Sequence, residues 1–201
     1  MIRSALLLGC LSLTGSAMAA GAAVGSPAPD FKLKDTAGKS VSLADLKGKV
    51  VVLEWFNPEC PYVRAAHTKG SLVGLAKKHT EKGVVWLAVN SGAPGKQGAG
   101  AEKSIAGAKT FGLDHPILLD ETGTVGHAYG ATNTPHLFVI SKEGKLVYAG
   151  GIDNSPDGEK GSPEGGTLVN YVDAALDDLA QGKPVQRPTS KPYGCSVKYG
   201  S

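Results

Sequence analysis

The feature that most constrains the fold is an apolar run, KVVVLEWF, at residues 49–56. Its β-branched and aromatic side chains are typical of a strand buried in the centre of a sheet. A second run of this kind spans 84–89. Each run is followed by a stretch with apolar residues at helical spacing, 61–82 after the first and 101–111 after the second. Strands that alternate with helices in this way predict an α/β sandwich with a mixed sheet.

Shorter elements complete the predicted order. We expect a hairpin over 28–41 with Gly38 in its turn, and one helical turn at 43–46 that Ser42 caps. Gly70 weakens the predicted helix at 61–82 near its middle. The remaining predicted elements are strands at 117–119, 137–140 and 146–149 and helices at 122–129 and 167–180. Because no internal repeat or second domain is visible, one domain is expected.

The composition excludes several classes of protein. The chain has 201 residues, a net charge of +3 and 19% charged residues, which suits one globular domain. Beyond the N-terminus, no apolar run reaches the roughly 18 residues that a membrane-spanning helix needs. A basic stripe with interleaved aromatic residues, as nucleic-acid binding would require, is also missing. We therefore expect neither a transmembrane segment nor a nucleic-acid partner.

The start of the chain has the pattern of an export signal. A short cationic start precedes an apolar stretch at 5–13, and Ala17 and Ala19 supply the small residues before a signal-peptidase cut. We expect residues 1–19 to be removed and the mature protein to be exported to a periplasm. The alternative is a lipoprotein anchored through Cys10, which follows Leu-Leu-Gly in the sequence.

Removal of the signal leaves two cysteines, Cys60 and Cys195. In an oxidising compartment, such a pair forms a structural disulfide or contains a reactive thiol. Cys60 follows the first buried strand and precedes Pro61, a residue well suited to the first position of a helix. The sulfur then lies at a helix N-terminus, where free N–H groups and the helix dipole stabilise a thiolate. Since the thiolate is the nucleophile, this placement favours a reactive Cys60 over an inert buried one.

Several motifs occur together over about residues 24 to 200. They are VVVLEWF before Cys60, CPYV at 60–63, Thr134-Pro135 before a strand, PAPDF at 27–31, LD at 119–120, YG at 129–130, GKLVY at 144–148 and GCSVK at 194–198. This set resembles the redoxin branch of the thioredoxin fold, the alkyl hydroperoxide reductase and thiol-specific antioxidant superfamily, in a peroxiredoxin-like subgroup. The resemblance implies an α/β, thioredoxin-like three-layer sandwich, with a central mixed β-sheet flanked by helices and an N-terminal β-hairpin extension. It implies a domain over 24–182 and a Pro-rich C-terminal tail at 183–201.

The resemblance also assigns roles around the cysteine. Thr134-Pro135 matches the cis-proline loop of the fold, whose backbone lies beside the reactive sulfur and can pair with an extended partner. Two residues depart from the family patterns, because Val63 stands where a dithiol reductase has its second cysteine and Asn57 stands where a peroxiredoxin has Thr or Ser. The peroxiredoxin arginine is also missing near Thr134-Pro135. Arg64, one turn after the cysteine, either supplies positive charge there or is an ordinary surface residue.

Cys195 lies in the Pro-rich tail, which we expect to be flexible. Such a tail could carry Cys195 to an oxidised Cys60 as a resolving thiol, or Cys195 could be structural or unpaired. We expect an exported thiol-dependent oxidoreductase in which Cys60 reduces peroxides or exchanges disulfides. The supporting residues are Asn57, Pro61, Arg64, Thr134 and Pro135.

The expected partners are a peroxide or protein-disulfide substrate and an external thiol reductant, without a cofactor. The alternative is a non-catalytic thioredoxin-fold binding module with a static Cys60–Cys195 disulfide. Because the five histidines lack the spacing of zinc ligands, no metal site is expected. Glu54 lies in the first buried strand, and it is either the carboxylate that the fold family often keeps there or a residue that faces a solvated edge. His136 either lines the cleft beside Pro135 or is an ordinary strand residue.

Overall fold

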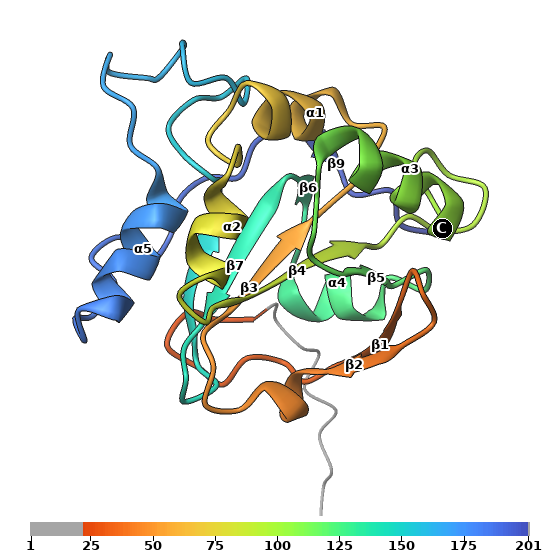
Figure 1. Ribbon diagram of the computed structural model, residues 1–201, viewed down its shortest axis with the longest axis horizontal. Helices are drawn as coiled ribbons and strands as arrows, with labels where there is room; N and C mark the ends of the chain where they lie inside the picture. Colours follow the sequence, from red (N-terminus) through yellow and green to blue (C-terminus); the bar gives the residue numbers. More distant parts are fainter. Residues whose placement is uncertain (1–21, 201) are drawn as a thin grey trace, which may run out of the picture.

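A seven-stranded sheet runs through the middle of the molecule (Figure 1). Its strands are β1 (Lys32–Asp35), β2 (Ser40–Ser42), β3 (Val51–Trp55), β4 (Val85–Asn90), β5 (Ile117–Leu119), β7 (His136–Ile140) and β8 (Leu146–Gly150). Across the sheet, the order is β2-β1-β5-β4-β3-β7-β8. Strands β3, β4 and β5 are parallel, and the other neighbouring pairs are antiparallel. The predicted mixed sheet with an N-terminal hairpin, β1–β2, is therefore confirmed.

The structure is a computed structural model that describes residues 22–200. The predicted signal peptide at 1–19 and the alternative lipid anchor at Cys10 lie outside the described residues. Within 22–200, no helix is both long and apolar enough to cross a membrane.

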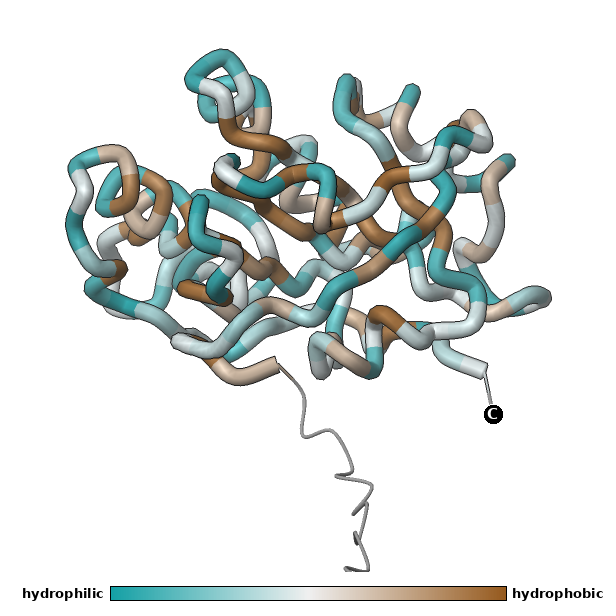
Figure 2. Tube along the Cα trace, turned by 90° about the horizontal axis from the view of Figure 1, so that it is seen from below, coloured by the Kyte–Doolittle hydropathy of each residue, from teal (hydrophilic) through white to brown (hydrophobic). Residues whose placement is uncertain are grey.

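Strand β3 is central because every one of its side chains is buried. It pairs with β4 on one side and with β7 on the other. Side chains alternate between the two faces of a strand, so Val51, Leu53 and Trp55 belong to one core cluster while Val52 belongs to another. The apolar segments accordingly gather inside the molecule and the hydrophilic ones lie in the outer loops (Figure 2). This two-sided burial explains why the sequence of β3 is apolar almost throughout.

Helices cover both faces of the sheet and complete three layers (Figure 1). They are η1, a 3₁₀ turn (Leu43–Leu46), α1 (Pro61–Thr68), α2 (Leu75–Thr80), α3 (Ala101–Phe111), α4 (Thr124–Tyr129) and α5 (Tyr171–Ala180). The core beneath Val52 contains residues of α1, α2 and α5, whereas the core around Trp55 contains residues of α4. Helix α5 begins later than predicted, because Asn170 caps it by accepting a hydrogen bond of 2.9 Å from the Asp173 N–H.

The single helix predicted over 61–82 is wrong. The structure has two helices there, α1 and α2, separated by residues 69–74. Gly74, at the start of α2, has a left-handed backbone with φ of 73°, which glycine adopts without steric cost. Gly70 packs directly against the carbonyl oxygen of Gly158, which belongs to the loop before α5. The break is therefore a tertiary packing feature that the local apolar pattern does not show.

We expect Gly70→Ala to lower the free energy of unfolding by about 1–3 kcal/mol, the usual range for overpacking. The added Cβ would overlap the Gly158 carbonyl oxygen and lie 2.6 Å from Cα of Ala66, and both contacts are backbone atoms. Urea denaturation measures the loss. Gly161→Ala is the matched control, because a Cβ at Gly161 meets nothing within 4 Å. Equal midpoints for the two variants would contradict the packing argument.

The C-terminal segment differs from the expected flexible tail. Residues 188–190 run beside β8, where Ala149 N–H donates to the Pro188 carbonyl at 3.1 Å and Ser190 N–H donates to the Ala149 carbonyl at 3.3 Å. Further on, β9 (Cys195–Ser196) pairs antiparallel with β6 (Asn133–Thr134). The proline content predicted an extended backbone, but the backbone finds hydrogen-bond partners on the body of the domain.

Candidate functional site

Cys60 is the N-cap of α1, and Pro61 occupies the first helical turn as the sequence predicts. The chain leaves β3 at Trp55 and closes a tight turn, in which the Cys60 N–H donates to the Asn57 carbonyl at 3.1 Å. The Arg64 N–H donates to the Cys60 carbonyl at 3.0 Å and begins the helix. The side chain of Cys60 is 0% exposed. The sulfur therefore lies at the N-terminus of α1, where the sequence predicts it.

Three distant segments meet at the Cys60 sulfur. Cys60 Sγ lies 3.1 Å from the carbonyl oxygen of Thr134 and 2.9 Å from Sγ of Cys195. The Thr134-Pro135 peptide bond is cis, as the resemblance implied. Cys195 reaches this position because it stands opposite Thr134 in the β6–β9 pair.

The two cysteines are free thiols in contact. Their sulfur–sulfur distance of 2.9 Å exceeds the roughly 2.05 Å of a covalent disulfide. Burial, together with the hydrogen bond and charge of the neighbouring Cys60 sulfur, raises the pKa of Cys195 to about 11. Cys195 is therefore protonated at neutral pH, and the Cys60 sulfur donates a hydrogen bond to the Thr134 carbonyl while it contacts Cys195. The arrangement is a pair of thiols in direct contact, with the Cys60 sulfur buried at the start of α1 and the Cys195 sulfur on the tail.

Asn57 holds the turn before Cys60 and does not contact the sulfur in any hydrogen bond of the described chain. Its side-chain oxygen accepts from the Glu59 N–H at 2.9 Å, and its amide donates to the Gln97 carbonyl at 3.2 Å. Glu59 in turn accepts a hydrogen bond of 2.8 Å from the Gly98 N–H. Gly98 packs so closely on the Asn57 side chain that a Cβ there would overlap it. Asn57 thus positions the Cys60 turn against the glycine-rich loop at 91–100.

Arg64 lies on the outer surface of α1. Its residue is exposed and lines a shallow hollow beside Pro58 and Lys103. Within residues 22–200, its guanidinium forms no hydrogen bond or ion pair with a side chain. The geometry therefore favours the surface interpretation of Arg64 over a contact with the reacting sulfur.

His136 is buried beside Pro135 and is held as a neutral imidazole. Its Nδ1 accepts a hydrogen bond of 3.3 Å from the Thr132 N–H, and its ring packs 4.3 Å from that of Phe138. Burial lowers the pKa of His136 to about 4. These contacts favour the interpretation of His136 as an ordinary strand residue, which holds the loop beside β6 in place.

Glu54 of β3 and His67 of α1 form a buried ion pair, of which the sequence indicates only Glu54. Glu54 Oε1 lies 2.6 Å from Nε2 of His67, and Glu54 Oε2 accepts from the Trp86 indole at 3.1 Å. Burial alone would raise the pKa of Glu54, but the charge and hydrogen bond of His67 hold it below its ordinary value. The pair lines a cavity of about 160 Å³ whose wall includes His115. His67 falls on the buried face of α1 with Val63 and Ala66, and that helical spacing is the signal that could have found it.

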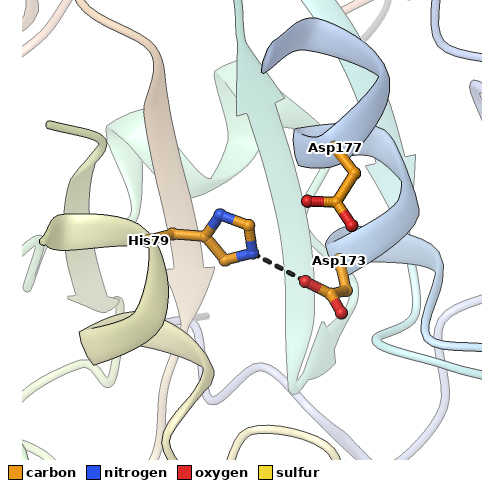
Figure 3. Close-up of side chains that lie close together, drawn as sticks. All are labelled: His79, Asp173 and Asp177. Atoms are coloured by element: carbon orange, nitrogen blue, oxygen red, sulfur yellow. Dashed lines mark hydrogen bonds and ion pairs between the residues drawn. The ribbon is translucent and has the colours of Figure 1, made fainter. Parts of the chain in front are cut away.

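A second cluster of polar side chains joins α2 to α5 (Figure 3). His79 points at Asp173, with Nε2 2.7 Å from Oδ1, and Asp177 lies beside them. The ammonium group of Lys78 is 2.6 Å from the same Asp173 oxygen. Because Lys78 already neutralises this carboxylate, we interpret the cluster as an ion-pair network that pins the two helices together.

Comparison with known proteins agrees with this geometry. Residues 23–162 match the protein family described as Redoxin. The chain belongs to the redoxin family. It is an oxidoreductase of the thioredoxin fold, as the resemblance in the sequence implied.

Relatives of this redoxin include the thiol-disulfide oxidoreductases ResA of Geobacillus thermodenitrificans and Bacillus subtilis. The first is 39% identical over 125 residues, which cover 62% of this chain and 67% of the relative. The second is 35% identical over 126 residues, which cover 61% of this chain and 64% of the relative. The alignments thus span about two thirds of these curated relatives.

Two solved structures resemble nearly the whole redoxin chain. A hypothetical protein from Sinorhizobium meliloti has a TM-score of 0.75 and 28% identity, over 90% of this chain and 97% of its own. An uncharacterized conserved protein from Geobacillus kaustophilus has a TM-score of 0.74 and 33% identity, over 89% and 93%. The thioredoxin-like three-layer architecture is therefore shared over most of the chain.

Proposed function

We propose that the protein is a thiol–disulfide oxidoreductase in which Cys60 is the nucleophile and Cys195 the resolving thiol. The observation that carries this proposal is the 2.9 Å contact between the two sulfurs. Val63 stands where dithiol reductases keep their second cysteine, and the tail supplies a thiol in its place. The names of the ResA relatives support the same reaction class.

The proposed reaction has two exchange steps. In the first, the Cys60 thiolate attacks one sulfur of a substrate disulfide, forms a mixed disulfide and releases the other substrate sulfur as a thiolate. In the second, Cys195 attacks the Cys60 sulfur, which forms the Cys60–Cys195 disulfide and releases the second substrate sulfur, and the departing sulfur takes up the proton that Cys195 loses. The substrate gains two electrons and the enzyme dithiol loses them. An external dithiol reductant restores the two thiols by the reverse exchange.

The surrounding residues support each step. The helix N-terminus at Pro61 stabilises the Cys60 thiolate before attack and again when it is the leaving group. The Thr134 carbonyl, 3.1 Å from the sulfur, accepts the S–H bond in the resting dithiol and orients the thiol. Asn57 fixes the turn that holds Cys60 in place. We place this chemistry outside the cytoplasm, as the export pattern of residues 1–19 predicts.

The test is a comparison of oxidants on the reduced mature protein. One equivalent of oxidised glutathione or of hydrogen peroxide is added, the reaction is quenched with acid, and free thiols are alkylated before peptide mass spectrometry. We expect glutathione disulfide to yield the Cys60–Cys195 cross-linked peptide and two equivalents of reduced glutathione. Unfolded protein in urea is the control, and its thiols should react without preference for this cross-link.

Three results would change the assignment. A cross-link that forms with peroxide and not with glutathione disulfide would make the protein a peroxidase. A cross-link that no dithiol reduces in the folded protein would make it a static structural bond and support the binding-module alternative. Oxidation of Cys60 without any cross-link would show that Cys195 is not the resolving thiol.

A further inference from the structure

The C-terminal segment pairs with the body of the domain in the way that a bound peptide would. Strand β9 pairs antiparallel with β6, and Cys195 stands opposite Thr134. The pairing continues beyond β9, where the Val197 N–H donates to the Thr132 carbonyl at 3.0 Å. The side-chain amide of Asn133 adds a hydrogen bond of 3.0 Å to the Gly194 carbonyl. Backbone hydrogen bonds of this kind are the usual means by which an extended peptide adds to a sheet edge.

The residues on both sides of Cys195 fit closely against the body of the domain. Gly194 packs against the Thr134 carbonyl oxygen so closely that a Cβ there would overlap it. Two residues after Cys195, Val197 is 9% exposed and belongs to the core cluster around Trp55. The exposed side chain of Ser196 lies between them and points away from the core.

Tyr199 fills a slot that two glycines leave open on α4. A Cβ on Gly126 would overlap the Tyr199 hydroxyl, and one on Gly123 would come within 2.6 Å of its ring. The ring stacks on His127 at 4.0 Å, and the hydroxyl donates to the Ala131 carbonyl at 2.7 Å. Side chains in place of these two glycines would close the slot. The body of the domain is thus shaped to receive an aromatic side chain four residues after a cysteine.

The seated tail also closes the site. Cys60 is 0% exposed, and Cys195 and its neighbours occupy the sheet edge beside it. A protein disulfide has to reach both the Cys60 sulfur and the free edge of β6. It can do so only when residues 194–199 leave that edge.

We propose that residues 194–199 are an internal substitute for the substrate, and that an extended cysteine-containing segment of a partner protein replaces them on β6 and α4. The proposal rests on the function proposed above and names its substrate class. The preferred segment has glycine immediately before its cysteine, an aliphatic residue two positions after it and an aromatic residue four positions after it. These are the places that Gly194, Val197 and Tyr199 fill in the resting protein.

This exchange couples chemistry to release of the product. After the substrate segment has formed its mixed disulfide with Cys60, the tail returns to β6 and displaces the segment from the edge. The same movement brings Cys195 to the Cys60 sulfur, so the covalent bond and the backbone pairing of the product are lost together. Reduction by the external dithiol then restores the starting state.

The first test measures how well the tail covers Cys60. In the full mature chain with Cys195→Ser, Cys60 is the only cysteine after Cys10 has left with the signal, and its alkylation by iodoacetamide reports local opening. We expect Tyr199→Ala in this background to raise the alkylation rate by about tenfold, because opening of a buried site follows the contacts that hold it closed. Lys198→Ala is the matched control, since within the described chain its side chain forms one hydrogen bond, of 3.3 Å, to the exposed Ser196 hydroxyl. Equal rates in all three proteins would overturn the proposed cover.

The second test measures recognition with the same Cys195→Ser protein. Each of two peptides, YGCSVKYG and YGCSAKAG, is joined to glutathione through its cysteine, and the rate of exchange with Cys60 is compared with that of glutathione disulfide. We expect the first peptide to react about tenfold faster than the second, which lacks both anchoring side chains. Equal rates for the two peptides would overturn the substrate class while leaving thiol–disulfide exchange intact. Failure of all three disulfides to react would instead overturn the proposed function.

Discussion

Cys60→Ser is expected to abolish disulfide reduction, with a loss on the order of 10⁴-fold or more in the rate. The hydroxyl of serine does not ionise near neutral pH, so the stabilising N–H groups at the start of α1 have no anion to hold. The measurement is the reduction of a model disulfide at a fixed concentration of external dithiol. The fold should persist, because serine fills nearly the same volume as cysteine.

Cys195→Ser is expected to block the second exchange step and leave the first one intact, since Cys60 keeps its nucleophilic sulfur. The first exchange proceeds, and the mixed disulfide then accumulates to about one equivalent per chain because no second thiol lies at the Cys60 sulfur. Intact-protein mass spectrometry measures the added substrate half. Ser196→Ala, on the exposed side of β9, is the control and should turn over like the wild type. If Cys195→Ser turns over at the wild-type rate without the adduct, an external thiol resolves Cys60 directly.

The central part of the fold follows from the sequence because its determinants are local. The runs at 49–56 and 84–89 are apolar on both faces, and they became β3 and β4 with shifts of one or two residues at their ends. The helix at 101–111 was predicted with its observed bounds for α3. By contrast, the break in the predicted helix at 61–82 depends on Gly70 meeting Gly158, and a local apolar pattern carries no information about a partner so far along the chain.

The residues of the candidate site also differ in whether the local sequence indicates them. Cys60 and Pro61 are placed by the strand and helix on either side of them, and the local pattern shows both. The Thr134-Pro135 loop was implied by the resemblance, since proline alone does not distinguish a cis bond from a trans one. The sequence leaves the partner of Cys60 open, because the proline-rich tail predicts flexibility while the glycines that receive Tyr199 lie in another part of the chain.

The buried pair of Glu54 and His67 leads to a prediction about the stability of the fold. Their side chains are 0% and 4% exposed, and Trp86 donates a further hydrogen bond to the carboxylate. Glu54→Ala would remove the charge that compensates His67 and leave the Trp86 N–H without its acceptor. We expect the free energy of unfolding at pH 7 to fall by about 3–5 kcal/mol, the usual loss when one partner of a buried ion pair is removed. Urea denaturation measures the difference.

Glu54→Gln is the matched control, because glutamine retains the shape and can still accept from Trp86. It should lose less stability than Glu54→Ala, and the difference between the two variants isolates the hydrogen bonds and packing from the charge. Equal losses would mean that only the charge matters. No loss in either variant would contradict a stabilising role for the pair.

The pH dependence of the wild-type protein provides an independent check with a defined sign. Folding lowers the pKa of Glu54 below its ordinary value of 4.5, so the folded protein binds this proton less tightly than the unfolded chain. The stabilisation from Glu54 is therefore fully present above about pH 4.5 and is lost as the pH falls through the lowered pKa of the folded state. Below about pH 4.5, the stability gap between wild type and Glu54→Gln, which has no titrating group at position 54, should narrow as Glu54 takes up its proton. A gap that continues to widen below about pH 4.5 would show that the folded state favours the protonated carboxyl, and the interpretation of the pair as ionised would then be wrong.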